Sequence, residues 1–117
     1  MAKELQRQLG TTIDGVISGQ WPANERYLWA CDRGVIEYAK GGLGSDVVRA
    51  LQDKVGCKVY PAVGGVQARQ MGSGTVYKHQ QWLIANGISC GSSGADGYQG
   101  RDTNVAIGKA LVKRLYR

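Results

Sequence analysis

Few side chains in this sequence are suited to acid–base or nucleophilic chemistry. His79 is the only histidine, and its place on a helix flank without a cysteine or histidine cluster predicts a surface or half-buried residue. Asp14, Asp96 and Asp102 fall in turns or at a helix start, where aspartate accepts backbone hydrogen bonds, so we do not expect a catalytic carboxylate pair. No nucleophile-elbow motif is present. The sequence therefore predicts a chain that binds without catalysis and uses no cofactor or metal.

The cysteines support the same conclusion. Three cysteines are an odd number, and no two of them form a C-x-x-C pair. This excludes the usual zinc spacings and argues against a disulfide framework, because one thiol would be left over. We expect Cys31, Cys57 and Cys90 to be small buried residues of a protein made in a reducing cytoplasm.

The most informative stretch covers residues 96–115. Asp96-Gly97 is a turn pair, Gly100 gives a second point of backbone freedom, and Asp102 or Thr103 is expected to cap the helix that follows. Cations near the end of that helix suit its dipole. The predicted apolar stripe consists of Val105, Ile107, Ala110, Leu111, Val112 and Leu115.

A second pattern precedes this one in the chain. Residues 48–56 follow V-x-x-L-Q-x-x-x-G, and residues 96–106 follow D-G-x-x-G-x-x-T-x-x-A. The two halves in this order resemble the repeat of the peptidoglycan-binding domain family, the small helical modules attached to bacterial and phage cell-wall hydrolases. A first copy, L-Q-x-x-x-G followed by Asp14-Gly15, lacks the G-x-x-T half and resembles the wall-binding tails of phage endolysins.

This resemblance implies an all-α fold, a small helical bundle of stacked repeats joined by glycine-rich turns. One cell-wall-binding domain would cover residues 1–117, because a single repeat is too small to bury its own apolar face. Residues 1–40 would form a degenerate first repeat and an aromatic connector, residues 41–86 the second repeat, and residues 80–117 a third repeat that shares a helix with the second.

Several local features of this arrangement follow from the sequence. Residues 23–31 are expected to form a helix, and residues 35–38 a short extended segment. Ser45 or Gly44 should cap the second L-Q helix, and Ser73 or Thr75 the helix at 76–86. The apolar stripe of that last helix is expected to include Val76, Gln80, Leu83 and Ile84, and Gln81 takes the glutamine position of the third repeat.

The same resemblance implies a non-catalytic role, in which the chain holds a linked amidase or muramidase on the cell wall. The ligand would be peptidoglycan or an attached polymer such as teichoic acid, bound between an Asp-Gly turn and the neighbouring helix. Aromatic faces stack on sugars, and planar polar groups fix their substituents. The candidates, each of which also has an ordinary structural explanation, are Trp21, Trp29, Tyr60, Arg69, Gln70, Tyr77, Asp96, Tyr98, Gln99 and Arg101.

The net charge of the chain is also compatible with partners other than the cell wall. The chain carries 15 Lys and Arg against 9 Asp and Glu, and its net charge of +6 suits a polyanion. A small nucleic-acid-binding protein or a phage structural protein is the alternative, although the basic residues are scattered along several helices. No membrane span and no signal-peptide pattern is recognisable, so we expect synthesis in the host cytoplasm and action at the wall after release. The incomplete first repeat and its aromatics suggest a homo-oligomer.

Overall fold

The computed structural model describes residues 1–32 and 34–117. These residues form the α-helices α1 (Ala2–Leu9), α2 (Asp46–Lys54), α3 (Ser73–Ala85) and α4 (Arg101–Val112). They also form a 3-10 helix, η1 (Pro22–Tyr27), and two strands, β1 (Ile17–Gln20) and β2 (Ile36–Tyr38). None of the helices within the described residues is long and apolar enough to cross a membrane.

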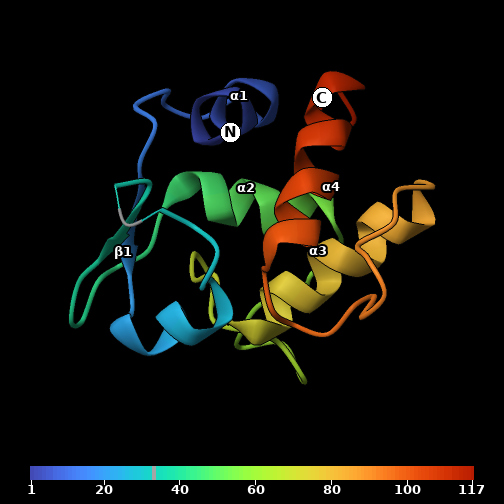
Figure 1. Ribbon diagram of the computed structural model, residues 1–117. Helices are drawn as coiled ribbons and strands as arrows, with labels where there is room; N and C mark the ends of the chain where they lie inside the picture. The colour runs from blue at the N-terminus through green and yellow to red at the C-terminus, as the bar shows by residue number, and fades with distance from the viewer. Residues whose placement is uncertain (33) are drawn as a thin grey trace.

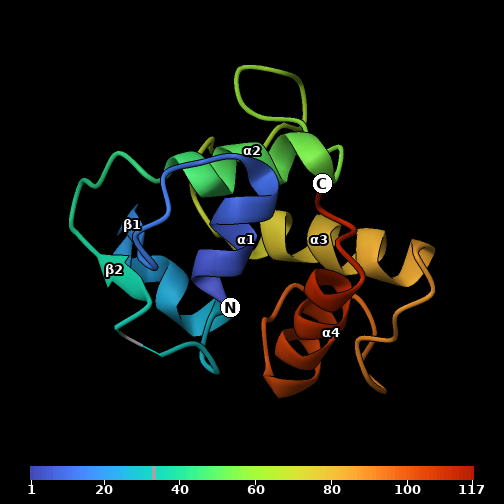
Figure 2. The same ribbon diagram turned by 90° about the horizontal axis from the view of Figure 1, so that it is seen from above.

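The four α-helices surround one core. Helix α1 lies against α2 and α4, and α3 also contacts both α2 and α4 (Figures 1 and 2). Each helix contributes fully buried aliphatic side chains, among them Leu5, Leu51, Leu83 and Ile107. The side chain of Gln8 in α1 donates a buried hydrogen bond to the carbonyl of Leu111 in α4, 2.7 Å away. The first and last helices are thus joined by both apolar and polar contacts.

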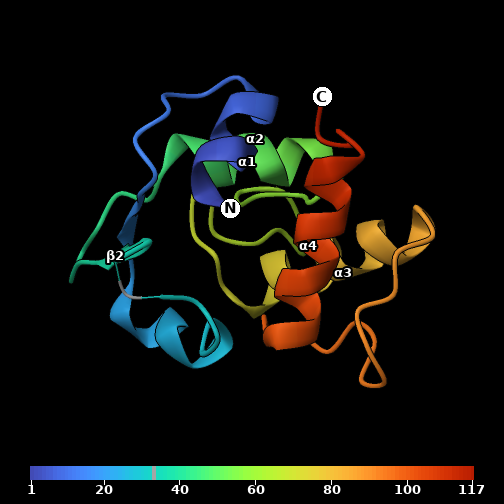
Figure 3. The same ribbon diagram turned by 45° about the horizontal axis from the view of Figure 1, so that its top comes forward.

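A small sheet corrects the expectation of a purely helical fold. Strands β1 and β2 pair in parallel, with Ile17 opposite Ile36 and Gln20 opposite Tyr38. They lie on the side of the molecule away from α4 (Figures 1 and 3). The expected extended segment at 35–38 is therefore present, whereas the expected helix at 23–31 is a 3-10 helix that ends at Tyr27. The chain is mostly helical, but it is not all-α.

The predicted capping residue is found at the start of one helix and not at the starts of two others. Ser45 caps α2 as expected, its hydroxyl accepting a hydrogen bond from the Val48 amide. Helices α3 and α4 instead begin after Gly72 and Gly100, without a side-chain cap. The expected caps, Ser73 or Thr75 for α3 and Asp102 or Thr103 for α4, all lie inside these helices. The hydroxyls of Thr75 and Thr103 accept hydrogen bonds from buried glutamines instead.

Three residues assigned to apolar stripes are exposed. Ile84, Val105 and Val112 face solvent, whereas Val76, Gln80, Leu83, Ile107, Ala110 and Leu111 are buried as expected. The predicted stripes were too wide because four-residue and seven-residue spacings do not by themselves say which edge of a helix meets its neighbour. The position of His79 also differs from the prediction. It is 1 % exposed, at the centre of the molecule rather than on its surface.

Candidate functional site

A buried glutamine holds the Asp96-Gly97 turn in place. The Gln80 side-chain oxygen accepts hydrogen bonds from the backbone amides of Asp96 and Gly97, at 3.0 and 2.8 Å. Its nitrogen donates to the Asp96 carboxylate, to the Tyr98 carbonyl and to the Thr103 hydroxyl. One side chain on α3 thus satisfies five polar groups of residues 96–103 and fixes the path of that loop into α4.

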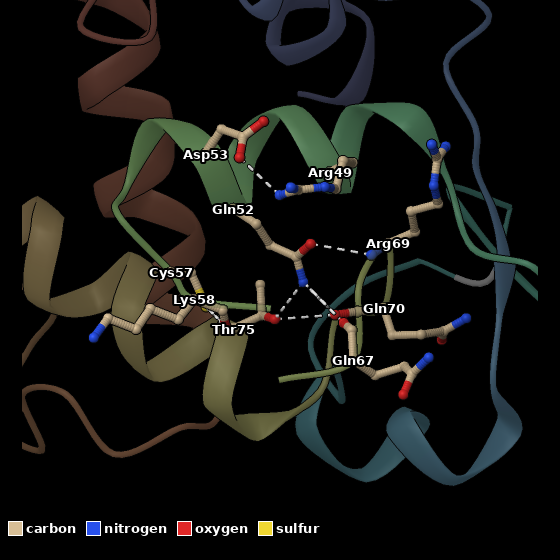
Figure 4. A network of polar contacts seen from close by, with 9 residues as sticks. All are labelled: Arg49, Gln52, Asp53, Cys57, Lys58, Gln67, Arg69, Gln70 and Thr75. Atoms are coloured by element: carbon tan, nitrogen blue, oxygen red, sulfur yellow. Dashed lines mark hydrogen bonds and ion pairs between the residues drawn. The ribbon is translucent and has the colours of Figure 1, made fainter. Parts of the chain in front are cut away.

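The second repeat contains an equivalent network around Gln52. Figure 4 shows the Gln52 side chain pointing from α2 into the loop at 67–70, where its oxygen accepts the Arg69 amide at 3.0 Å. Its nitrogen donates to the Gln67 and Gln70 carbonyls and to the Thr75 hydroxyl. Gln52 and Gln80 are both fully buried. The two networks therefore satisfy the same kinds of loop groups in the same order.

The first repeat has a reduced form of this network. Gln6 on α1 accepts hydrogen bonds from the amides of Asp14 and Gly15 and donates to the Asp14 carboxylate and the Val16 carbonyl. The chain then enters β1 instead of a helix, so no threonine joins the network. The network around Gln6 therefore lacks the threonine contact that Gln52 and Gln80 make.

These three glutamines give the register of the repeats. Leu5-Gln6, Leu51-Gln52 and His79-Gln80 occupy equivalent positions, so the glutamine of the third repeat is Gln80 and not the exposed Gln81. Ala68-Arg69 stands at the position of the Asp-Gly turn, and Arg69 has a positive φ of 66°, comparable to the 81° of Gly97. The second repeat therefore has this turn although it carries no Asp-Gly pair. Arg69 forms an ion pair with Asp46.

The loop that precedes α4, which we call the third loop, borders a cleft of about 330 Å3, the Trp29 cleft. It brings together four of the ten residues that the sequence singled out: Trp29, Asp96, Tyr98 and Arg101. The remaining lining residues, which the sequence did not indicate, are Cys90, Ser93, Gly100, Asp102 and Thr103. The cleft lies between the Asp-Gly turn and the start of α4, where the family resemblance implied a binding groove.

Trp29 forms an aromatic wall of this cleft. A Cβ atom added to Gly100 would lie 2.8 Å from Cζ2 of Trp29, so the indole ring rests directly on the glycine. Trp29 is nevertheless 60 % exposed, which leaves much of the ring free. Tyr98 is also exposed, and its ring packs against Tyr27 with a centroid distance of 5.5 Å. The cleft thus presents two partly exposed aromatic side chains on a preformed support.

Hydrogen bonds from the third repeat hold the segment that carries Trp29. The Gln99 amide donates to the Tyr27 carbonyl at 2.7 Å, and the Asn104 side chain donates to the Ala30 carbonyl at 3.2 Å. The Gln99 side chain donates to the Cys31 sulfur and to the Asn104 side-chain oxygen. The aromatic connector is therefore fixed on both sides of Trp29.

The other predicted binding residues are distributed elsewhere. Gln70 and Gln99 are buried, and their side-chain nitrogens donate hydrogen bonds within the chain, so they position loops rather than face solvent. Tyr60 and Tyr77 are exposed and line neither the Trp29 cleft nor the cleft beside Trp21. The cleft beside Trp21, the Trp21 cleft, measures about 540 Å3. It is lined by Trp21, Pro22, Ala23, Lys40, Gly41, Gly42, Leu43, Gln67, Ala68 and Gln70.

The most strongly shifted titratable groups lie away from both clefts. His79 Nε2 is 2.6 Å from the Tyr116 hydroxyl, and both side chains pack beside Trp82. Burial lowers the pKa of His79 to about 3 and raises the pKa of Tyr116. Burial also raises the pKa of the Cys31, Cys57 and Cys90 thiols, which keeps them protonated; Cys57 and Cys90 are buried as expected, and Cys31 is half-buried.

The described residues contain no cluster of three or more His, Cys, Asp or Glu side chains that could hold a metal ion.

No protein-family model, no curated protein and no solved structure matches this chain.

Proposed function

We propose that this chain is a non-catalytic cell-wall-binding module that binds peptidoglycan saccharide in the Trp29 cleft. The observation that carries the proposal is the convergence of Trp29, Asp96, Tyr98 and Arg101 on one cleft beside an Asp-Gly turn. These residues come from the connector, the third loop and the start of α4, and hydrogen bonds within the chain hold all three segments.

The chemistry of the cleft suits a sugar. An exposed aromatic face stacks on the apolar side of a pyranose ring, and the preformed indole on Gly100 makes this contact with little loss of side-chain entropy. The guanidinium of Arg101 and the carboxylate of Asp96 supply donors and acceptors for hydroxyl and acetamido groups.

Charge favours the saccharide over a phosphate-bearing wall polymer at this position. The carboxylates of Asp96 and Asp102 line the cleft with a single cation, Arg101, so the local charge opposes a phosphate. The cleft carries one more carboxylate than cation, so the positive excess of the chain lies on other residues, where it assists the approach to a polyanionic wall.

The module holds a linked cell-wall hydrolase on its substrate, as in a phage endolysin or a prophage-type autolysin. Tethering converts each encounter of the catalytic domain with the wall into an intramolecular event and raises its effective concentration. The bond is cleaved by that catalytic domain, an amidase or a muramidase, and not by this chain.

Replacing Trp29 by alanine tests the proposal. We expect retention on purified Gram-positive cell walls to fall about 5- to 30-fold, since loss of one stacking contact removes on the order of 1–2 kcal/mol and empties the cleft wall. Co-sedimentation of the chain with walls, followed over a range of wall concentrations, gives the apparent Kd.

Tyr60→Ala is the matched control, because Tyr60 is a 69 % exposed aromatic residue outside both clefts. Its retention should equal that of the unchanged chain. Equal losses for both variants would show that wall binding uses exposed aromatics without regard to the cleft and would refute the assignment of the site.

A further inference from the structure

The second repeat carries a cleft at the positions equivalent to those of the Trp29 cleft. In the register given by Gln52 and Gln80, Ala68 corresponds to Asp96 and Gln70 to Tyr98. Ala68 and Gln70 line the Trp21 cleft, just as Asp96 and Tyr98 line the Trp29 cleft. The two clefts are therefore related by the internal repeat and are not independent surface hollows.

Each cleft also receives one tryptophan from the same connector. Trp21 immediately precedes η1 and Trp29 follows it by two residues. The Trp21 indole nitrogen donates to the Gly42 carbonyl at 2.9 Å, which fixes the ring beside the glycine turn, and the residue remains 37 % exposed. Both clefts thus combine a fixed indole, a glycine and a repeat loop.

A buried network builds the Trp21 cleft. The Gln70 side chain accepts the Trp21 amide at 2.8 Å and donates to the Gly19 carbonyl, while the Gln20 side chain accepts the Met71 amide and donates to the Arg69 carbonyl. Gln20 is fully buried, and Gln70 is 3 % exposed. These reciprocal contacts hold β1 and Trp21 against the loop at residues 67–71.

The two clefts differ in charge. Lys40 is the only charged residue that lines the Trp21 cleft among those the structure describes, whereas two carboxylates and one guanidinium line the Trp29 cleft. A cation without a neighbouring carboxylate suits a ligand that carries a carboxylate beside its sugar. Leu43, which is 89 % exposed, supplies an apolar contact at the same cleft.

We propose that the Trp21 cleft is a second saccharide site that takes a carboxylate-bearing sugar, so that one chain holds two segments of the same wall polymer. This inference rests on the proposed function of the Trp29 cleft. Helix η1, which lies between the two tryptophans in the chain, is about 12 Å long at a rise of roughly 2 Å for each of its six residues, a length within reach of a single glycan strand. A polymer bound at one cleft thus has a high effective concentration at the other.

The test is calorimetric titration of the chain with soluble disaccharide–peptide fragments released from purified peptidoglycan by a muramidase. The unchanged chain should bind two fragments, and Trp21→Ala and Trp29→Ala should each bind one. On intact walls, where both clefts act together, Trp21→Ala should weaken retention by at least about 10-fold. Leu43→Ala should weaken fragment binding at the Trp21 cleft without affecting folding, because the Leu43 side chain is 89 % exposed.

Lys40→Glu should weaken binding at the second site about 5-fold or more, whereas Lys58→Glu, an equal charge change at an exposed residue outside both clefts, should leave it unchanged. One fragment bound by the unchanged chain and none by Trp29→Ala would overturn the second site and leave the proposed function standing. No fragment bound by any of these proteins would overturn both.

Discussion

Replacing Gln80 by alanine is expected to lower the free energy of unfolding by about 3–5 kcal/mol. The substitution leaves the amides of Asp96 and Gly97 without their acceptor and the Thr103 hydroxyl and the Tyr98 carbonyl without their donor. An unsatisfied buried group costs about 1–3 kcal/mol, and the truncated side chain also leaves a cavity at a fully buried position.

Chemical denaturation followed by circular dichroism measures this change. Gln81→Ala is the matched control, because Gln81 is the adjacent glutamine on the exposed face of α3, and its unfolding free energy should shift by less than about 0.5 kcal/mol. A similarly small loss for Gln80→Ala would show that the loop at 96–103 is held by other contacts and that the glutamine network is not what positions the Trp29 cleft.

Acidification is expected to destabilise the fold through His79. Its pKa is lowered to about 3 in the folded chain, against about 6.5 in an unfolded one, so the unfolded state binds more protons between these values. The stability contributed by neutral His79 is complete above pH 6.5 and is lost as pH falls toward 3. At about 1.4 kcal/mol per unit of pKa, the loss over the whole window is on the order of 5 kcal/mol.

The double substitution His79→Leu with Tyr116→Phe tests this origin. Leucine is the residue at the equivalent positions 5 and 51, and phenylalanine avoids leaving the Tyr116 hydroxyl unpaired. The unfolding free energy of the double variant should change little between pH 6.5 and 4.5, while that of Tyr116→Phe alone should still fall. An equal fall in both proteins would assign the acid sensitivity to carboxylates instead of His79.

The repeated L-Q and D-G patterns predicted more of the structure than did helix propensity. Gly10, Gly56 and Gly97, the glycines of these patterns, all adopt positive φ. The sequence did not show that the glutamine of each L-Q pair binds the following loop. The sequence does show that Gln6 and Gln52 each precede a turn. Their hydrogen bonds to that turn are tertiary contacts, which a sequence pattern does not show.

Tertiary contacts also explain the errors. Ala68-Arg69 adopts the turn conformation of Asp-Gly because Gln52 accepts the Arg69 amide, and no local propensity of arginine predicts a positive φ. His79 occupies a leucine position and is buried because Tyr116 provides a hydrogen-bonding partner from the end of the chain. The parallel pairing of β1 with β2 depends on residues 18 or 19 positions apart and leaves no periodic pattern in such short strands.

Some of the candidate residues lie close together for a reason that the sequence shows. Asp96, Tyr98 and Arg101 belong to the third turn and the start of α4, and they line the same cleft. The meeting of Trp29 with Gly100 joins segments about 70 residues apart, and only the fold reveals it. Lys40 and Leu43 were missed for the same reason, since Trp21 meets the second repeat through tertiary hydrogen bonds, to Gly42 and to Gln70.

The most direct measurement is retention of the intact chain on purified Gram-positive cell walls, before and after acid extraction of teichoic acids, at low and high salt. Stacking contacts to a saccharide persist in salt that screens exposed charges, with a Debye length of about 3 Å at 1 M. The account therefore predicts retention on extracted walls at high salt. Binding that disappears on extraction would contradict a saccharide ligand, and failure to bind any wall would contradict the proposed function itself.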